Sequence, residues 1–330
     1  MPHPLRVSFP EYLDYISSLF ITARSSTVIT GYWRSGTTWV QQVISHSLQA
    51  RRIFEPLYPK IIRYSRLRPT YVSKIGGERP LDAAWMPFSK GNLPVSFQKY
   101  LRDCLTGRIC LTHQSGIKGY WLRSARNTQW EALQPRVVVK FVRGQLMLPG
   151  LLSTFDVPIL HLRRDPRAVL ASFKRKGWVD WFRCDTPLQH LLLRGGDGRE
   201  EYFGQWRNDI EQIDHAGSAF GQAAAYWVLT ERYVDEVPAE NENVRIVRFQ
   251  RLKEERNSYL LDVLDALGVE GAEPVPEDIF EKRSMTAQES TEDAQVQGNS
   301  GWEDTLTTSE VNEIDHALDV FDFTSSAYTE

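Results

Sequence analysis

Four short apolar runs constrain the fold of this 330-residue chain more than any other feature. Each run is continuously rather than alternately apolar, which is the pattern of strands buried on both faces of a parallel sheet. The runs comprise residues 27–30, 136–142, 158–162 and 244–249. Helical patterns lie between and after them, at residues 37–49, 167–176, 200–213, 221–234, 258–267 and 309–321. Strands that alternate with helices predict an α/β fold, a three-layer sandwich with a central parallel sheet.

The length of the chain allows one large α/β domain or two ordinary ones. Because no linker divides it, we predict a single domain over residues 1–330. Two long stretches, near residues 50–130 and 177–201, show no clear periodicity and are rich in Pro or in Trp and Gly. Both are too long for plain loops in a compact domain, so we expect insertions that form a substrate lid. Residues 12–20 have helical spacing and predict an amphipathic helix.

The composition argues against several classes of protein. Lys and Arg number 39 against 42 for Asp and Glu, a net charge of −3, which argues against nucleic-acid binding through bulk positive charge. No run of 18 apolar residues occurs, so we expect no membrane span. The three cysteines have no metal-ligand spacing, which predicts reduced, structural thiols in a cytoplasmic protein without a metal site.

The stretch GYWRSGTTWV follows the first apolar run and opens the first helical pattern. A phosphate-binding loop of the nucleotide triphosphatases reads G-x-x-x-x-G-K-[ST]. Here Gly31 and Gly36 have that spacing, but Thr37 stands in place of the Lys, and the cation is Arg34. Free backbone N–H groups at a helix N-terminus attract anions. Because Arg34 is a planar, permanently charged donor, we expect this strand–loop–helix unit to hold a shorter anion without an obligatory metal.

A second anion site is predicted where the run ending near Leu162 meets the next helix. Asp165 is a natural N-cap and Pro166 suits the first helical position. Arg164 therefore lies on the strand-to-helix turn, at the carboxyl end of a strand, where parallel α/β sheets bind their ligands. Ser172 follows two turns along the helix, on the same face as Asp165.

With both sites in place, the sequence resembles the sulfotransferases that use 3′-phosphoadenosine 5′-phosphosulfate (PAPS). Arg34–Trp39 matches their 5′-phosphosulfate loop, and Arg164–Arg167 followed by Ser172 matches their 3′-phosphate motif. Residues 248–269 resemble the strand and helix beside the adenine. A C-terminal glycine motif is matched by Gly298, Gly301 and Trp302, without the basic residue that usually follows, for which Arg283 is a candidate substitute.

The resemblance implies a P-loop-like sulfotransferase that takes PAPS as donor, releases 3′-phosphoadenosine 5′-phosphate (PAP) and needs no metal. Arg34 would brace the bridging oxygen as the sulfuryl group leaves, and Arg164 and Ser172 would grip the 3′-phosphate. Trp39 would stack on the adenine, although plain core packing is an equal reading of that residue alone. The remaining donor-site residues implied by the resemblance are Ser35, Gly36, Thr37, Thr38, Gly301 and Trp302.

The general base is the main departure from the family. Cytosolic members carry Lys-Thr-His where this chain has Lys140-Phe141-Val142, and valine cannot accept a proton. The carbohydrate and tyrosyl branches place a Glu roughly twenty residues after the loop Arg, and Glu55 follows Arg34 by 55 − 34 = 21 residues in the string Phe-Glu-Pro. We favour Glu55 as base if desolvation raises its proton affinity; the alternative is a surface Glu before a proline.

Other polar residues compete for roles in the reaction. His113 is the second candidate for the base, although a lone His is more often structural. Lys140 either neutralises the transferring sulfuryl group or extends from a strand end toward solvent. His161 lies inside a predicted core strand and reads as structural. Four tryptophans of the irregular stretches either wall an apolar acceptor pocket or belong to the core: Trp85, Trp121, Trp178 and Trp181.

The sequence therefore predicts a sulfotransferase that acts on a hydroxyl or amine of a small molecule, for instance a natural product. Two rival functions stay open. A P-loop kinase or other nucleotide phosphotransferase would need a Lys after Gly36 and an acidic Mg²⁺ ligand. A non-catalytic nucleotide-binding protein would account for the missing His.

Overall fold

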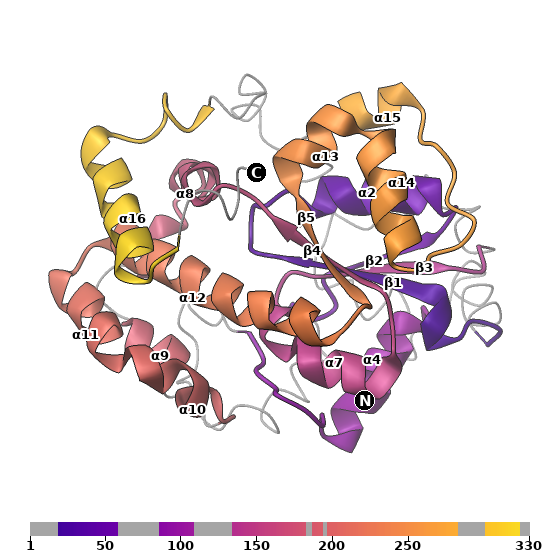
Figure 1. Cartoon of the computed structure of the whole chain (residues 1–330), viewed down its shortest axis with the longest axis horizontal. Helices are drawn as coiled ribbons and strands as arrows, with labels where there is room; N and C mark the ends of the chain where they lie inside the picture. The colour runs from indigo at the N-terminus through magenta and orange to yellow at the C-terminus, as the bar shows by residue number, and fades with distance from the viewer. Residues whose placement is uncertain are drawn as a thin grey trace, which may run out of the picture.

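The computed structural model describes residues 19–58, 86–108, 134–182, 187–193, 197–282 and 301–323. A parallel sheet of five strands lies at its centre, in the order β2-β3-β1-β4-β5 (Figure 1). The strands are β1 (Ser26–Gly31), β2 (Arg51–Phe54), β3 (Val137–Phe141), β4 (Ile159–Arg163) and β5 (Val244–Arg248). Every neighbouring pair is parallel, so all five carboxyl ends meet at one edge of the sheet. The predicted α/β fold with a central parallel sheet is confirmed.

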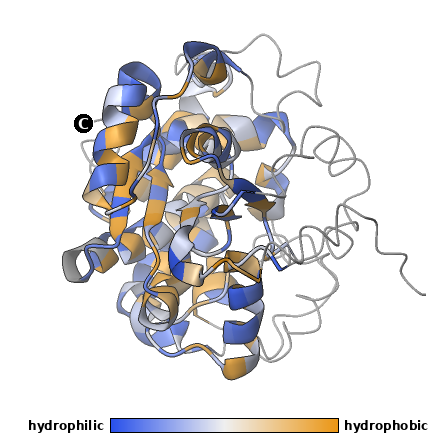
Figure 2. Cartoon of the chain, turned by 90° about the vertical axis from the view of Figure 1, so that its right-hand side faces the viewer, coloured by the Kyte–Doolittle hydropathy of each residue, from blue (hydrophilic) through white to orange (hydrophobic). Residues whose placement is uncertain are grey.

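Helices cover both faces of the sheet and complete the three layers (Figure 1). One face packs against α2 (Thr37–Ser47) and α14 (Asn257–Ala266), with α13 (Phe249–Glu255) and α15 (Glu277–Glu281) beside them. The other face packs against α4 (Val95–Leu105), α7 (Leu148–Phe155) and part of α12 (Ala219–Glu240). Figure 2 shows most helices carrying both hydrophobic and hydrophilic residues, as expected for helices with one face toward a core.

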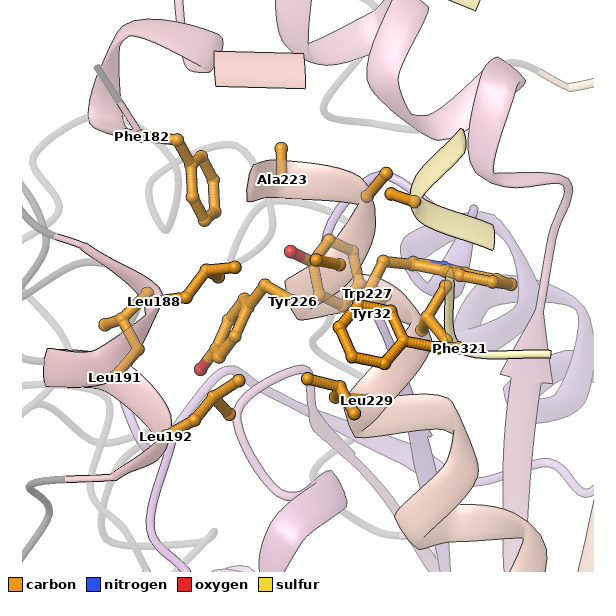
Figure 3. Packing of buried hydrophobic residues seen from close by; sticks show 14 of the residues in the cluster. Tyr32, Phe182, Leu188, Leu191, Leu192, Ala223, Tyr226, Trp227, Leu229 and Phe321 are labelled. Atoms are coloured by element: carbon orange, nitrogen blue, oxygen red, sulfur yellow. The ribbon is translucent and has the colours of Figure 1, made fainter. Parts of the chain in front are cut away.

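A further layer of helices packs on the outer part of α12 and forms its own core. Figure 3 shows Tyr226 of α12 against Leu188, Leu191 and Leu192. The helices of this layer are α8 (Pro166–Arg175), α9 (Leu188–Leu192), α10 (Arg199–Phe203), α11 (Arg207–Ala216) and α16 (Thr308–Val320). Four short 3₁₀ helices complete the described elements: Ala23–Ser25, Gln145–Met147, Val179–Phe182 and Gly204–Trp206. No helix of the described part is long and apolar enough to cross a membrane.

Several elements differ from their sequence prediction. β2 and α4 lie inside the stretch 50–130, which we expected to be irregular. β2 has a single apolar pair after two arginines, so it lacks the continuous run that marked the other strands. The helix predicted over 200–213 is divided into α10 and α11 by the 3₁₀ turn Gly204–Trp206. The helix expected at residues 12–20 lies almost wholly outside the described residues.

A buried polar network ties the sheet to α12. His161 accepts or donates at both ring nitrogens, 2.9 Å from Thr30 Oγ1 and 2.9 Å from Glu231 Oε2. Arg163 Nε also donates to Glu231 Oε2, at 2.7 Å. Burial raises the pKa of the Glu231 carboxyl, but the charges and hydrogen bonds of His161 and Arg163 outweigh burial and leave that pKa below its ordinary value. The network confirms His161 as a structural residue of the sheet.

We predict that Glu231→Ala lowers the free energy of unfolding by about 3 kcal/mol, because it leaves Arg163 buried without its main partner. Urea denaturation measures the change. Since the pKa of Glu231 is depressed in the folded state, its contribution is complete above the ordinary Glu pKa and is lost as pH falls through the lowered value. Asp235→Asn, which alters the half-exposed partner of Arg163, is the control and should cost about 1 kcal/mol. Equal losses in the two variants would contradict the role of the buried network.

Candidate active site

The loop between β1 and α2 has the backbone geometry of a cradle for an anion. Gly31 and Gly36 have φ of 150° and 96°, and a Cβ on Gly36 would stand 2.5 Å from the Phe249 ring. No side chain caps the N-terminus of α2 in the described part of the chain. The Ser35 hydroxyl is buried without a hydrogen-bond partner there. Open amides and an orphaned hydroxyl together fit the phosphosulfate end of a nucleotide.

Arg34 joins this loop to the second predicted anion site. Its Nε donates to Ser172 Oγ of α8 at 2.8 Å, and its guanidinium lies 5.7 Å from the ring centroid of Trp178. Arg164 Nη1 in turn donates to the Arg34 carbonyl at 3.3 Å. Arg34 adopts φ of 67°, an uncommon conformation for a residue with a side chain and one that clusters at functional sites. The two sites that the sequence predicted separately therefore adjoin.

Arg164 carries the electrostatic signature of an anion site. Burial, then the charges of Arg34 and Arg175, lower the pKa of its guanidinium to about 10, against a small opposing effect of Asp165. Its Nε is buried without a hydrogen-bond partner among the described residues, and the guanidinium lies 4.6 Å from the Phe249 ring centroid. The predicted N-cap is confirmed, since Asp165 accepts from the Arg167 amide at 2.7 Å. A dianion at this point would relieve the repulsion between the cations.

Lys140 lies at the floor of the site rather than extending to solvent. Its Nζ donates to Thr38 Oγ1 at 2.8 Å and lies 3.5 Å from the Phe54 ring centroid, with the residue 2% exposed. Burial lowers the pKa of Lys140 to about 7; Glu55 partly restores it, and Arg143 and Arg34 lower it further. The reading of Lys140 as a lysine that reaches solvent is therefore wrong.

Glu55 is buried beside Lys140, so the reading of a surface glutamate is wrong as well. It is 6% exposed, and it adopts φ of 44° directly after β2. One carboxylate oxygen accepts from the Val142 amide at 2.7 Å and lies 3.9 Å from Lys140 Nζ. The other lies 3.3 Å from Arg143 Nη1. Its carboxylate thus lies beside Val142, the position at which the sequence departs from the motif of the family that it resembles.

Arg143 belongs to the site and was missed from the sequence. It is 4% exposed, and its guanidinium lies 5.5 Å from the ring centroid of Trp33 and 5.2 Å from that of Tyr58. Its position could have indicated this role, because Arg143 lies just beyond the end of β3 and parallel sheets bind ligands at the carboxyl ends of their strands.

Three further residues that the resemblance assigned to the donor site lie outside the Arg34–Glu55 cluster. Trp39 is buried in a core cluster, with Nε1 donating to the Phe280 carbonyl at 3.3 Å and its ring edge-on to Phe249. These contacts are those of a core residue. Trp302 lies under Arg167 of α8, 5.6 Å from its guanidinium, and the Gly301 carbonyl accepts from Thr305. Both therefore lie beside α8 and not in the Arg34–Glu55 cluster.

Trp178 and Trp181 stack on each other at 4.7 Å next to the site. Five predicted residues lie outside the described part of the chain: Trp85, His113, Trp121, Arg283 and Gly298.

The chain was compared with protein-family models and with solved structures. A family model for the sulfotransferase domain matches residues 24–316. Among solved structures, a sulfotransferase from Mycobacterium tuberculosis is 13% identical with a TM-score of 0.39, covering 94% of this chain and 80% of its own. A mouse sulfotransferase complexed with PAP is 14% identical with a TM-score of 0.40, covering 97% and 91%.

A retinol dehydratase in complex with androsterone and inactive cofactor PAP is 14% identical with a TM-score of 0.36, covering 98% of this chain and 89% of its own. No curated protein matches the sequence. The family model alone spans all five strands of the sheet and both anion sites. The chain therefore belongs to the sulfotransferase domain family, as an enzyme of that family.

Proposed function

We propose that this sulfotransferase transfers the sulfuryl group of PAPS to a hydroxyl or amine of a small-molecule acceptor. The observation that carries the proposal is the contact of the two anion sites through Arg34, Ser172 and Arg164. Two adjoining anion sites suit one nucleotide that carries phosphates at both its 5′ and 3′ positions. The loop 31–36 would hold the 5′-phosphosulfate, and Arg164 with Ser172 would hold the 3′-phosphate.

The side chains around the loop suggest how the sulfuryl group is transferred. Glu55 accepts the proton of the acceptor hydroxyl or amine, and the acceptor atom bonds to sulfur as the bond from sulfur to the bridging phosphate oxygen breaks. Arg34 stabilises the charge that grows on that bridging oxygen, and the buried Lys140 stabilises the sulfuryl oxygens. The low exposure of Glu55 and Lys140 strengthens each of these interactions.

The acceptor would approach from the aromatic side of the site. Trp33 and Val142 belong to the same buried cluster as Met86 and Phe88 from the first lid stretch and Phe182 from the second. We accordingly propose that these two stretches cover an apolar acceptor pocket within a single domain of a cytoplasmic enzyme. Trp178, half-buried next to Arg34, would form part of its wall.

Calorimetric titration with PAP, in buffer without Mg²⁺, tests the donor site. We expect wild-type protein to bind PAP with micromolar or tighter affinity and Arg164→Ala to bind about 100-fold more weakly, because two charge-assisted hydrogen bonds are lost. Arg207→Ala is the matched control, since Arg207 is exposed at the start of α11 and belongs to neither predicted anion site; it should change affinity less than about threefold. Absence of PAP binding, with binding of ATP and Mg²⁺ instead, would contradict the proposal and favour the kinase.

A further inference from the structure

Arg143 is a buried cation of the site with no role assigned to it in either proposed phosphate site. It pairs with Glu55 at 3.3 Å, and the side chains of the pair are 5% and 8% exposed. Its guanidinium lies near Trp33, which belongs to the loop after β1, and near Tyr58, which follows β2. Arg143 itself follows β3. One buried side chain from the connection after β3 thus lies against the two connections that follow β1 and β2.

The geometry restricts where the carboxylate of Glu55 can point. The Val142 amide holds one oxygen at 2.7 Å, and Arg143 holds the other at 3.3 Å, so the plane of the carboxylate is fixed from two sides. Two oxygens offer about four acceptor positions, and these contacts leave positions for an incoming hydroxyl or amine. A proton acceptor held in this way is oriented before the acceptor molecule arrives.

The two cations beside Glu55 differ in the pH range over which they stay charged. Lys140, 3.9 Å from Glu55, has its pKa lowered to about 7, so it loses its charge in the neutral range. Arg34 acts on Lys140 from the loop, and Tyr226 of α12 lies within electrostatic reach of Arg143. Arg143 is an arginine and stays charged throughout. It is therefore the neighbour that keeps a positive charge beside Glu55 at every working pH.

We propose that Arg143 is the positioning residue of the general base: it orients the carboxylate of Glu55 toward the acceptor and places a permanent positive charge beside it. The inference rests on the proposed role of Glu55 as base. Trp33 and Tyr58 hold the guanidinium at its place, so the base is aligned with the loop that carries the donor. The chain thereby uses a carboxylate and an arginine from two strand ends where its cytosolic relatives would use one histidine.

The test compares kcat/KM against pH for wild type, Arg143→Met and Arg143→Lys, with Arg207→Met on the exposed side of α11 as the matched control. We expect Arg143→Met to lose about 100-fold at pH 7 through misorientation of the base. We also expect the acid limb of its profile to move up by about one pH unit or more, since an opposite charge has gone from beside the carboxylate. Arg143→Lys should restore the limb and part of the rate, and Arg207→Met should match wild type.

Two further measurements separate the possible failures. PAP titration of each variant reports on the fold and the donor site, and should stay within about threefold of wild type because the proposed role of Arg143 is to orient Glu55 and not to hold the donor. If Arg143→Met does not fold, Arg143→Gln takes its place in the comparison. If Arg143→Met loses rate without any movement of the acid limb, the inference is refuted. If Glu55→Gln is inactive in the same experiment, Glu55 remains the proposed base. A fully active Glu55→Gln refutes both.

Discussion

Glu55→Gln should lower kcat for sulfuryl transfer by about 10²- to 10⁴-fold, the usual contribution of a general base. Glutamine keeps the size of the side chain and an oxygen for the Val142 amide, but it cannot take a proton from the acceptor. PAP affinity should stay within about threefold of wild type, because Glu55 contacts Lys140, Val142 and Arg143 rather than either predicted phosphate contact. Initial rates with PAPS and an acceptor panel, beside PAP calorimetry, measure both quantities.

Glu242→Gln is the control for this variant, because Glu242 is exposed and precedes β5, at the opposite end of the sheet from the site. Its rate should equal that of wild type. Unchanged kcat in Glu55→Gln would exclude Glu55 as the base and would move His113 to first candidate. PAP binding by wild type without turnover of any acceptor would instead favour the non-catalytic nucleotide-binding protein.

Arg34→Met should lower kcat by about 10²- to 10³-fold, the cost of losing one preorganised donor to a developing anion. Arg34 reaches the site from a strained loop position and is held by Ser172 at 2.8 Å, so its guanidinium is already fixed before a ligand binds. Because the charge on the bridging oxygen grows during transfer, the rate should fall more than the affinity for PAP. Rapid-mixing kinetics and PAP titration on the same preparations measure the two effects.

Arg34→Lys is the matched variant, since it keeps the positive charge and loses the planar fork. It should recover part of the lost rate, because a positive charge stays beside the bridging oxygen. Equal losses of kcat and PAP affinity in Arg34→Met would show that Arg34 only anchors the ground state, and would contradict its role in the transition state.

Much of the proposed donor site was predictable because its signals are local. The spacing of Gly31 and Gly36 reflects a turn that needs positive φ at both positions. Asp165 and Pro166 mark the start of α8 through a cap and a first-turn proline, which depend on neighbours within a few residues. Strand-to-helix turns in a parallel sheet then deliver Arg34 and Arg164 to the same edge.

The proposed catalytic half of the site was harder to predict because its contacts are distant in sequence. Glu55 meets the Val142 amide across 87 residues and Arg143 across 88 residues. Glu55 and Lys140 are buried because β2 pairs with β3. The strand β2 was not predicted, since it lacks a continuous apolar run. For Trp39 the local motif was not a sufficient guide. The motif implied stacking on the adenine, but the folded chain packs the Trp39 ring against Phe249 and Phe280.

The sequence by itself determined the parallel sheet, the anion loop and the cap of α8, since each depends on residue type and short-range spacing. The tertiary structure decided which charges share the site. It buried Lys140 and Glu55 together, and it added Arg143 between Trp33 and Tyr58. The physical reason is that desolvation and the pairing of charges depend on distances through space, and only the packed strand order β2-β3-β1-β4 sets those distances.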